Sequence, residues 1–293
     1  MASRKEIEQT ITDLVIKQLQ EGKVPWRKPW VSNMPVSLST GKHYGGINLL
    51  LLSILGEQYA SPYWVTYKEA VRRGGNVKKG EKGTPIIKWS PFTRVNAAGD
   101  DVESFFLKQF YVFNIEQTEN VPAPAVPAPN FESVDDGIQA IIDAYATRPE
   151  IYHSNQDKAY YSPSKDSIHL PNRSQFNSGE EYAMTLAHEI IHSTGHPSRL
   201  HRFEVGDKTA VFGDADYAKE ELVADIGANM LLAQVGLEID LDNSASYIAG
   251  WLKALQNDPT LLMSACGKAQ KAVDFIVGKQ EAVVNVALDE VDA

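Results

Sequence analysis

Cysteine is almost absent from this 293-residue chain, because Cys266 is the only one and no disulfide can form within the chain. Long apolar runs are also missing. The longest, Ile47 to Leu55, falls far short of the roughly 20 residues that cross a bilayer. The polar N-terminus predicts no secretory signal. These absences argue against a disulfide-rich secreted domain and against a membrane-spanning protein, and they favour a reducing, cytoplasmic setting.

Positive charge is scarce overall, with 28 Lys and Arg against 38 Asp and Glu, but the deficit lies in one part of the chain. Residues 1–116 hold 16 basic and 11 acidic side chains, a net charge of +5, whereas the remainder holds 12 and 27, a net charge of −15. Such asymmetry predicts separate functions for the two parts. The first part can face an anionic polymer, and the second has no electrostatic reason to do so.

A proline-rich stretch separates the two parts. Between Gln117 and Phe131 the chain has prolines at 122, 124, 127 and 129. Prolines remove backbone donors and fix φ, so a stiff extended linker is expected over residues 117–131. The 43% apolar content is enough for two packed cores. The sequence therefore predicts one domain over residues 1–116 and another over 132–293.

Residues 1–116 show the patterns of a small α+β domain. Apolar residues recur at helical spacing in its first segment, and extended segments flank turn-forming residues near position 98. The expected elements are helices over Lys5–Glu21 and Ile47–Gln58, a helix from the capping box at Thr66 to the stop at Gly74-Gly75, and strands over Thr84–Pro91 and Val102–Ile115.

Residues 132–293 are expected to be mainly helical, with one hairpin. A capping-box pattern at Ser178 begins the central helix, and Gly195 ends it. The other expected elements are helices over Asp135–Thr147, Tyr217–Gln234, Ala245–Gln256 and Pro259–Gly278, and hairpin strands over Tyr160–Pro163 and Ser167–Leu170. The whole protein is therefore predicted to be α+β.

The central helix carries the pattern His-Glu-Ile-Ile-His at residues 188–192. His188 and His192 lie one turn apart on one face, so both imidazoles can bind one ion. Glu189 lies about 100° around the helix, where it can act as general base on a metal-bound water. So short a pattern arises often by chance. Its position on a well-signalled helix, after a hairpin able to pair with a peptide strand, favours a metal site. The expected ion is Zn²⁺, with another divalent transition metal as the alternative.

Two residues compete to be the third ligand. A metzincin would need histidine where Ser198 stands, and His196 comes two residues earlier. In the gluzincin pattern, Glu221 lies on a later helix with Asp225 one turn beyond it. This spacing lets Glu221 ligate while Asp225 accepts an imidazole N–H. Glu220 is then expected to be solvated at the start of its helix. The predicted set is His188, His192 and Glu221 as ligands, Glu189 as catalytic base and Asp225 in support.

The basic part holds four of the five tryptophans, in Pro25–Trp30, in Tyr63–Tyr67 and at Trp89. Aromatic residues interleaved with Lys and Arg favour non-specific binding of single-stranded DNA, because unpaired bases stack on rings while cations follow phosphates. No helical motif for a duplex groove is present. Tryptophan packs in cores more often than it binds ligands, so only some rings are expected to stack. The candidate DNA-binding residues are Trp26, Arg27, Lys28, Trp30, Lys42, Tyr44, Tyr63, Trp64, Tyr67, Arg72, Arg73, Lys78, Lys79 and Lys82.

Together these segments resemble the ArdC family of plasmid-encoded antirestriction proteins. The motifs that carry the likeness are Pro25-Trp26 to Trp30, Thr40–Asn48, Gly74–Pro85, Ile168–Pro171, Leu186–His196 and Arg199-Leu200. The resemblance implies an N-terminal single-stranded-DNA-binding domain, also found fused to some plasmid primases, and a C-terminal zincin-type metallopeptidase-like domain. It also implies a role in protecting incoming conjugative plasmid DNA from host restriction.

Two alternatives to this interpretation remain open. The first is a DNA-coating protein whose metal only braces the fold. The second is a DNA-dependent protease that acts on DNA-bound proteins, so that a restriction protein or another DNA-bound protein would be a second partner beside single-stranded DNA. Glu189 separates the first alternative from a hydrolytic site, because a structural metal does not need a general base.

Overall fold

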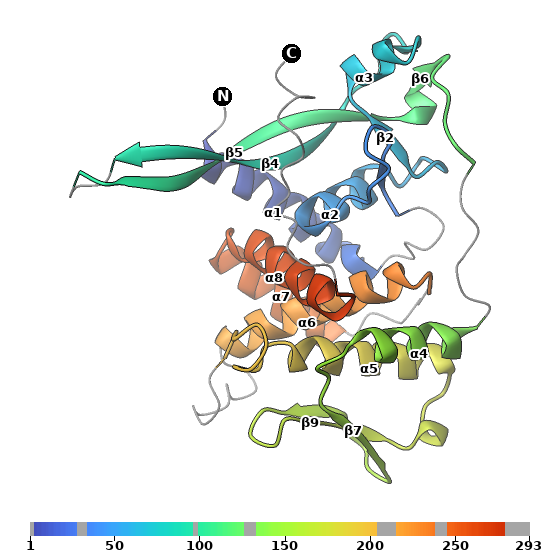
Figure 1. Ribbon diagram of the computed structural model, residues 1–293, viewed down its shortest axis with the longest axis vertical. Coiled ribbons are helices and arrows are strands. Elements are labelled where there is room, and N and C mark those ends of the chain that lie inside the picture. Colours follow the sequence, from blue (N-terminus) through green and yellow to red (C-terminus); the bar gives the residue numbers. More distant parts are fainter. Residues whose placement is uncertain are drawn as a thin grey trace. The chain divides into compact units, whose positions relative to one another are not determined.

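The computed structural model describes residues 3–27, 34–95, 99–125, 133–203, 215–237 and 245–278. Helices and strands form two compact units, in agreement with the predicted α+β class (Figure 1). Unit 1 comprises Met1–Pro129 and Asp240–Cys266, and unit 2 comprises Asn130–Ile239 and Gly267–Ala293. The units therefore do not follow the sequence order, because residues 240–266 belong with the N-terminal part. None of the described helices has the length and apolar character needed to span a bilayer.

Within its described residues, unit 1 contains a mixed sheet, a small two-stranded sheet, four whole α-helices and the first residues of a fifth. The larger sheet has the order β1-β2-β5-β4, with β1 parallel to β2 and the other pairs antiparallel. The elements are α1 (Arg4–Gln20), β1 (Val36–Ser37), α2 (Gly46–Leu55), β2 (Tyr63–Val65), α3 (Tyr67–Arg72), β3 (Asn76–Val77), β4 (Thr84–Val95), β5 (Asp101–Asn114), β6 (Thr118–Glu119) and α7 (Ala245–Asn257). The predicted helices over 5–21, 47–58 and from residue 66 are confirmed to within a few residues.

Helix α7 joins unit 1 through packing against the N-terminal segment. The indole of Trp251 is buried and meets the buried indole of Trp26 edge-on, with ring centroids 5.1 Å apart. The hydroxyl of Thr12 donates to the carbonyl of Pro259 at 2.8 Å. These contacts join residues more than 200 positions apart, so no local pattern could have assigned α7 to the first unit.

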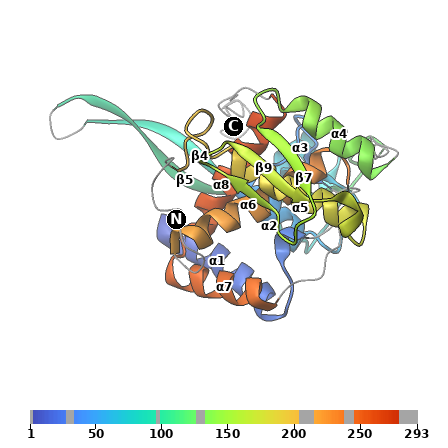
Figure 2. The same ribbon diagram turned by 90° about the horizontal axis from the view of Figure 1, so that it is seen from below.

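Strands β4 and β5 form a hairpin that is longer than the sequence predicted. Their register runs without a break from Thr84↔Val112 to Val95↔Asp101. Near its base the hairpin is held by Asn48 of α2, whose side chain donates to the carbonyl of Ile87 and accepts from its N–H, both at 2.7 Å. Beyond this point the hairpin extends past the helices of its own unit (Figures 1 and 2). We call residues 88–95 and 101–110 the β-arm. Residues 96–98 of the predicted turn lie outside the described residues.

The linker begins later than its composition indicated. Residues Ile115–Gln117 form a 3-10 turn, and strand β6 pairs antiparallel with β3. The proline-rich chain follows, and the hydroxyl of Tyr63 donates to the carbonyl of Ala125 at 3.1 Å. The later prolines at 127 and 129 lie outside the described residues. The first positions of the predicted linker, 117–119, are therefore part of the folded unit.

Unit 2 places a three-stranded sheet on a helical layer. The sheet has the order β7-β9-β8, with β9 parallel to β7 and antiparallel to β8, and β9 buries Ile168 and Leu170 completely. The elements are α4 (Val134–Ala144), β7 (Glu150–Ser154), β8 (Tyr160–Ser162), β9 (Ser167–Pro171), α5 (Gly179–Ser193), α6 (Ala215–Gln234) and the larger part of α8 (Leu261–Ile276). All predicted elements are present. Strand β7 was not predicted, because its largely exposed residues show no apolar alternation.

Candidate metal centre

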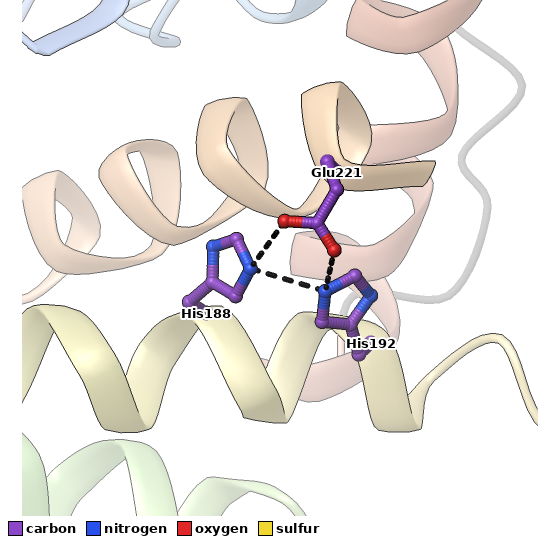
Figure 3. Close-up of side chains that lie close together, drawn as sticks. All are labelled: His188, His192 and Glu221. Atoms are coloured by element: carbon purple, nitrogen blue, oxygen red, sulfur yellow. Dashed lines mark hydrogen bonds and ion pairs between the residues drawn. The ribbon is translucent and has the colours of Figure 1, made fainter. Parts of the chain in front are cut away.

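Helices α5 and α6 pack closely enough to share a polar site. Ser178 caps α5 by accepting from the N–H of Glu181, as the capping pattern predicted. On α6, Gly227 permits the close approach, since a Cβ there would lie 2.9 Å from a methyl carbon of Ile191. One face of α5 presents two histidines one turn apart, and the start of α6 presents a glutamate toward them (Figure 3).

The three side chains predicted as ligands converge (Figure 3). The Nε2 atoms of His188 and His192 are 3.0 Å apart. The carboxylate of Glu221 places one oxygen 3.4 Å from His188 Nε2 and the other 3.3 Å from His192 Nε2. Ligands about 2.0–2.1 Å from a tetrahedral zinc ion lie roughly 3.3 Å from one another. The donors and their spacing therefore fit one divalent cation.

The outer nitrogen of His192 has a partner that the sequence did not reveal. Its Nδ1 lies 3.4 Å from Glu220, and Arg202 donates to both oxygens of that carboxylate, at 3.1 and 2.6 Å. Arg202 also donates to the Thr194 hydroxyl and the Ile191 carbonyl at the end of α5. Glu220 is therefore not the solvated residue expected at a helix start. Its carboxylate is held by an arginine beyond the end of α5, and this contact leaves no local sequence pattern.

The electrostatics of the site favour positive charge between the carboxylates. Burial lowers the pKa of His192, but the opposite effect of Glu220 and Glu221 is larger, and the pKa is raised to about 10. Burial raises the pKa of Glu221, yet the two histidines outweigh it and hold that pKa below its ordinary value. The pKa of Glu220 is also lowered, because His192 and Arg202 outweigh its burial. The site therefore keeps two carboxylates ionised around nitrogens that can hold a cation.

The remaining predicted residues take different places. Glu189 is buried, with 7% of its surface exposed, and its carboxylate is not one of the three converging groups. Asp225 is also buried, one turn beyond Glu221, and its contact with an imidazole stays a prediction. His196 shares a hydrogen bond with the Ser198 hydroxyl at 2.7 Å and is not part of the group. The structure thus brings Glu221, and not His196, to the two histidines.

The candidate DNA-binding residues of unit 1 divide by exposure. Trp26, Tyr63 and Trp64 are buried, with exposed fractions of 0%, 7% and 2%, so they are corrected from stacking candidates to core residues. Two of them lie on β2, which runs between β1 and β5 inside the sheet. Tyr44 is half-buried, and burial raises its pKa to about 12. The side chain of Arg27 and residues Lys28 and Trp30 lie outside what the structure describes.

The exposed candidates are mainly cationic. Glu69 accepts from the guanidinium groups of Arg72 and Arg73 at 2.6 Å each, and Arg73 also donates to the Leu38 carbonyl. These arginines are therefore partly committed to structure. Lys78 donates to the Glu116 carbonyl at 2.7 Å. The exposed candidates are Lys42, Tyr67, Arg72, Lys78, Lys79 and Lys82. Exposed rings that were not among the candidates include Trp89, Phe92 and Phe106 of the β-arm.

Two families match this chain over separate ranges. Residues 5–113 match the N-terminal domain of anti-restriction factor ArdC, and residues 138–268 match a zincin-like metallopeptidase. Among curated proteins, two DNA primases TraC of Escherichia coli are 37% and 35% identical over 95% and 96% of this chain. This chain spans only 28% and 20% of their lengths. The uncharacterized protein y4eC of Sinorhizobium fredii is 30% identical over 94% of this chain and 92% of its own.

Two solved structures of the antirestriction ArdC protein from plasmid R388 are similar over nearly the whole chain. The metal-free structure is 38% identical, with a TM-score of 0.77, over 94% of this chain and 97% of the other. The Mn(II)-bound structure is 37% identical, with a TM-score of 0.77, over 93% and 97%. A metal-bound relative and the converging donors of α5 and α6 together support a divalent metal site. The chain therefore belongs to the ArdC family of antirestriction proteins, with a zincin-like C-terminal domain.

Proposed function

We propose that this protein binds single-stranded DNA without sequence specificity and protects incoming plasmid DNA from restriction in the cytoplasm, and that its second domain holds one zinc ion in a hydrolytic site. The observation that carries the metal part is the convergence of His188, His192 and Glu221 on one point. The DNA part is supported by the +5 charge of residues 1–116, by the exposed lysines of residues 78–82 and by the similarity to an antirestriction protein.

Each residue of the centre has a distinct task in this proposal. His188, His192 and Glu221 would hold the ion and leave a position for water, whose pKa a bound zinc ion lowers. Glu189 directly follows His188 on α5 and would take the proton from that water. Glu220 and Arg202 fix the ring of His192, because a hydrogen bond at Nδ1 sets which nitrogen faces the ion.

A hydrolytic site is favoured over a purely structural metal. Structural zinc sites are closed by four protein ligands. Three donors meet here among the residues that the structure describes. A buried glutamate next to the first histidine would also have no task in a structural site.

A DNA-dependent protease is the second candidate function. Strand β8 is an edge strand of the three-stranded sheet in the described residues, and it pairs with β9 on its inner side. An extended peptide could add to such an edge through main-chain hydrogen bonds. Its substrate would then be a restriction protein or another DNA-bound protein.

The decisive experiment compares the intact protein with Glu189→Gln and His188→Ala. Metal content would be measured together with hydrolysis of an unfolded protein substrate and self-cleavage, each with and without single-stranded DNA. We expect one zinc ion in wild type and in Glu189→Gln, less in His188→Ala, and hydrolysis in wild type only. Loss of the ion from Glu189→Gln would refute its role as base. Metal binding without hydrolysis in wild type would favour the structural alternative.

Protection of DNA needs its own measurement. Plasmid transfer would be compared between restricting and non-restricting recipients, with wild type or Glu189→Gln supplied by the donor. Protection by both proteins would show that DNA binding suffices. An effect of wild type alone would tie protection to hydrolysis, and no effect of either would refute the antirestriction role.

A further inference from the structure

Two exposed phenylalanine rings of the β-arm lie side by side on neighbouring strands. Phe92 of β4 and Phe106 of β5 are 41% and 45% exposed. Their ring centroids are 5.9 Å apart and their planes are tilted by 59°. Neighbouring exposed phenylalanines leave apolar surface in water, and such surface commonly marks a binding site.

The register of the hairpin adds cations to the same face. Alternate residues of a strand point to the same side, so Lys88 and Phe92 share a face in β4, as Phe106, Lys108 and Phe110 do in β5. Lys88 is directly opposite Lys108. The ammonium group of Lys108 lies 5.2 Å from the centroid of the Phe110 ring. We call these five residues the aromatic face of the β-arm. Along the hairpin, the pair Lys88 and Lys108 therefore lies between the ring of Phe110 and the rings of Phe92 and Phe106.

The opposite face of the β-arm is different. It carries Trp89, whose ring is 41% exposed but has the guanidinium of Arg4 over it at 4.9 Å from the centroid. It also carries Val95, which is 66% exposed and paired with Asp101. Among the side chains that the structure describes, that face offers one exposed ring, which is already covered on one side, and a carboxylate near its end. Of the two faces, the aromatic face suits an anionic partner with flat apolar groups better.

We infer that the aromatic face of the β-arm binds single-stranded DNA by stacking unpaired bases on Phe92 and Phe106, while Lys88 and Lys108 lie along the phosphates. This inference rests on the proposed function and assigns it a surface. Stacking on an aromatic side chain tolerates any base, since every base has a π-face. It therefore accounts for binding without sequence specificity.

A single strand fits this face better than a duplex. A β-ribbon can enter the major groove, but there it reads base edges through hydrogen bonds. Phenylalanine has no donor or acceptor for such edges. In a duplex the faces of the bases are covered by their neighbours, whereas in a single strand they are available to Phe92 and Phe106.

The first test measures binding of a fluorescein-labelled oligothymidine to the full chain by anisotropy. Replacing both rings, with Phe92→Ala and Phe106→Ala together, should weaken binding about tenfold or more, since each stacked base contributes roughly 1–3 kcal/mol. The matched double variant Phe92→Tyr and Phe106→Tyr keeps both rings and should bind nearly as wild type. Val95→Ala removes exposed apolar surface from the opposite face and should leave affinity unchanged. Thermal unfolding and metal content check that every variant is folded.

A second test separates the lysines from the rings. Affinity for single strands falls with salt, with a slope of about 0.7 per phosphate neutralised. Lys88→Gln with Lys108→Gln should therefore lower the slope by up to about 1.4. The double alanine variant of the phenylalanines should lower affinity and leave the slope nearly unchanged. Equal slopes for the lysine variant and wild type would remove the lysines from the inferred contact.

The outcomes distinguish this inference from the proposed function. If wild type binds the oligothymidine and the double alanine variant binds it equally well, the surface is wrong and the proposed function stands. If wild type fails to bind it, the proposed DNA function itself fails. If the double alanine variant loses affinity for duplex more than for single strand, the β-arm reads a groove and the inference is overturned.

Discussion

The metal centre of unit 2 and the DNA-binding surface proposed for unit 1 differ in how their residues are encoded. His188 and His192 are four positions apart on one helix, so spacing alone predicted that they share a face. The residues proposed to stack on bases must be exposed, and exposure depends on packing between distant segments. Trp26 and Trp64 have the right chemistry and are buried, whereas Phe92 and Phe106 are exposed. Local spacing therefore predicts which side chains converge better than composition predicts which rings are exposed.

The largest expected effect tests whether Trp26 serves as a buried core residue and not as a stacking surface. Trp26→Ala should destabilise unit 1 by about 3–5 kcal/mol, because it removes a fully buried indole that packs on Trp251. Trp89→Ala should cost less than Trp26→Ala, since 41% of Trp89 is already exposed and it loses less buried surface together with its contact with Arg4. Denaturant unfolding followed by fluorescence measures both. A Trp26→Ala protein with wild-type stability but weak DNA binding would restore Trp26 as a stacking residue.

The next effect concerns the metal ligands. Glu221→Ala should lower zinc affinity by more than about 100-fold, because it removes a charged donor from the three that converge. Asp225→Ala should lower it about 10- to 100-fold if Asp225 supports an imidazole as predicted. His196→Ala should leave it nearly unchanged. Competition with a chromophoric chelator gives the three values. Metal loss from His196→Ala would mean that this histidine, and not Glu221, completes the site.

The sequence predicted most helices because their signals are local. Apolar spacing and the caps at Thr66 and Ser178 placed the helices within a few residues. It missed β2, whose three residues are all buried and therefore show no alternation. It also placed α7 in the second domain. The packing that joins α7 to unit 1 is with Trp26, more than 200 residues away, and such a contact leaves no local sequence pattern. In the candidate metal centre it named the three converging residues and missed Glu220, whose carboxylate is held beside His192 by Arg202.

A smaller effect would test that missed support. Glu220→Ala should lower zinc affinity about 10- to 100-fold, because Nδ1 of His192 loses its carboxylate partner. Glu220→Gln should lose less, since its amide oxygen can still accept from the imidazole. Arg202→Ala should resemble Glu220→Ala if the arginine acts by holding the carboxylate. Calorimetric zinc titration measures all three. Wild-type affinity in Glu220→Ala would leave Asp225 as the better candidate for support.

The smallest effect tests whether Arg72 and Arg73 of unit 1 serve stability or the proposed DNA binding. The side chain of Glu69 is only 7% exposed, and its carboxylate accepts hydrogen bonds from Arg72 and Arg73. The side chains of these arginines are 66% and 30% exposed. The hydrogen bond from Arg72 lowers the pKa of Glu69 below 4.5, against the effect of burial. Because the folded-state pKa is depressed, the ionised carboxylate stabilises unit 1 above pH 4.5, and this contribution is lost as pH falls through the depressed value.

Glu69→Gln should therefore cost about 1 kcal/mol of stability at neutral pH and flatten the acid side of the stability profile. Urea unfolding at a series of pH values measures both. The same variant leaves two guanidinium groups without their carboxylate, so affinity for the oligothymidine should rise slightly if Arg72 contacts phosphates. Arg72→Gln should then lower affinity, while Arg73→Gln should mainly lower stability, because Arg73 also holds the Leu38 carbonyl. Equal effects of the two arginine variants on DNA binding would show that exposure does not decide which of them contacts DNA.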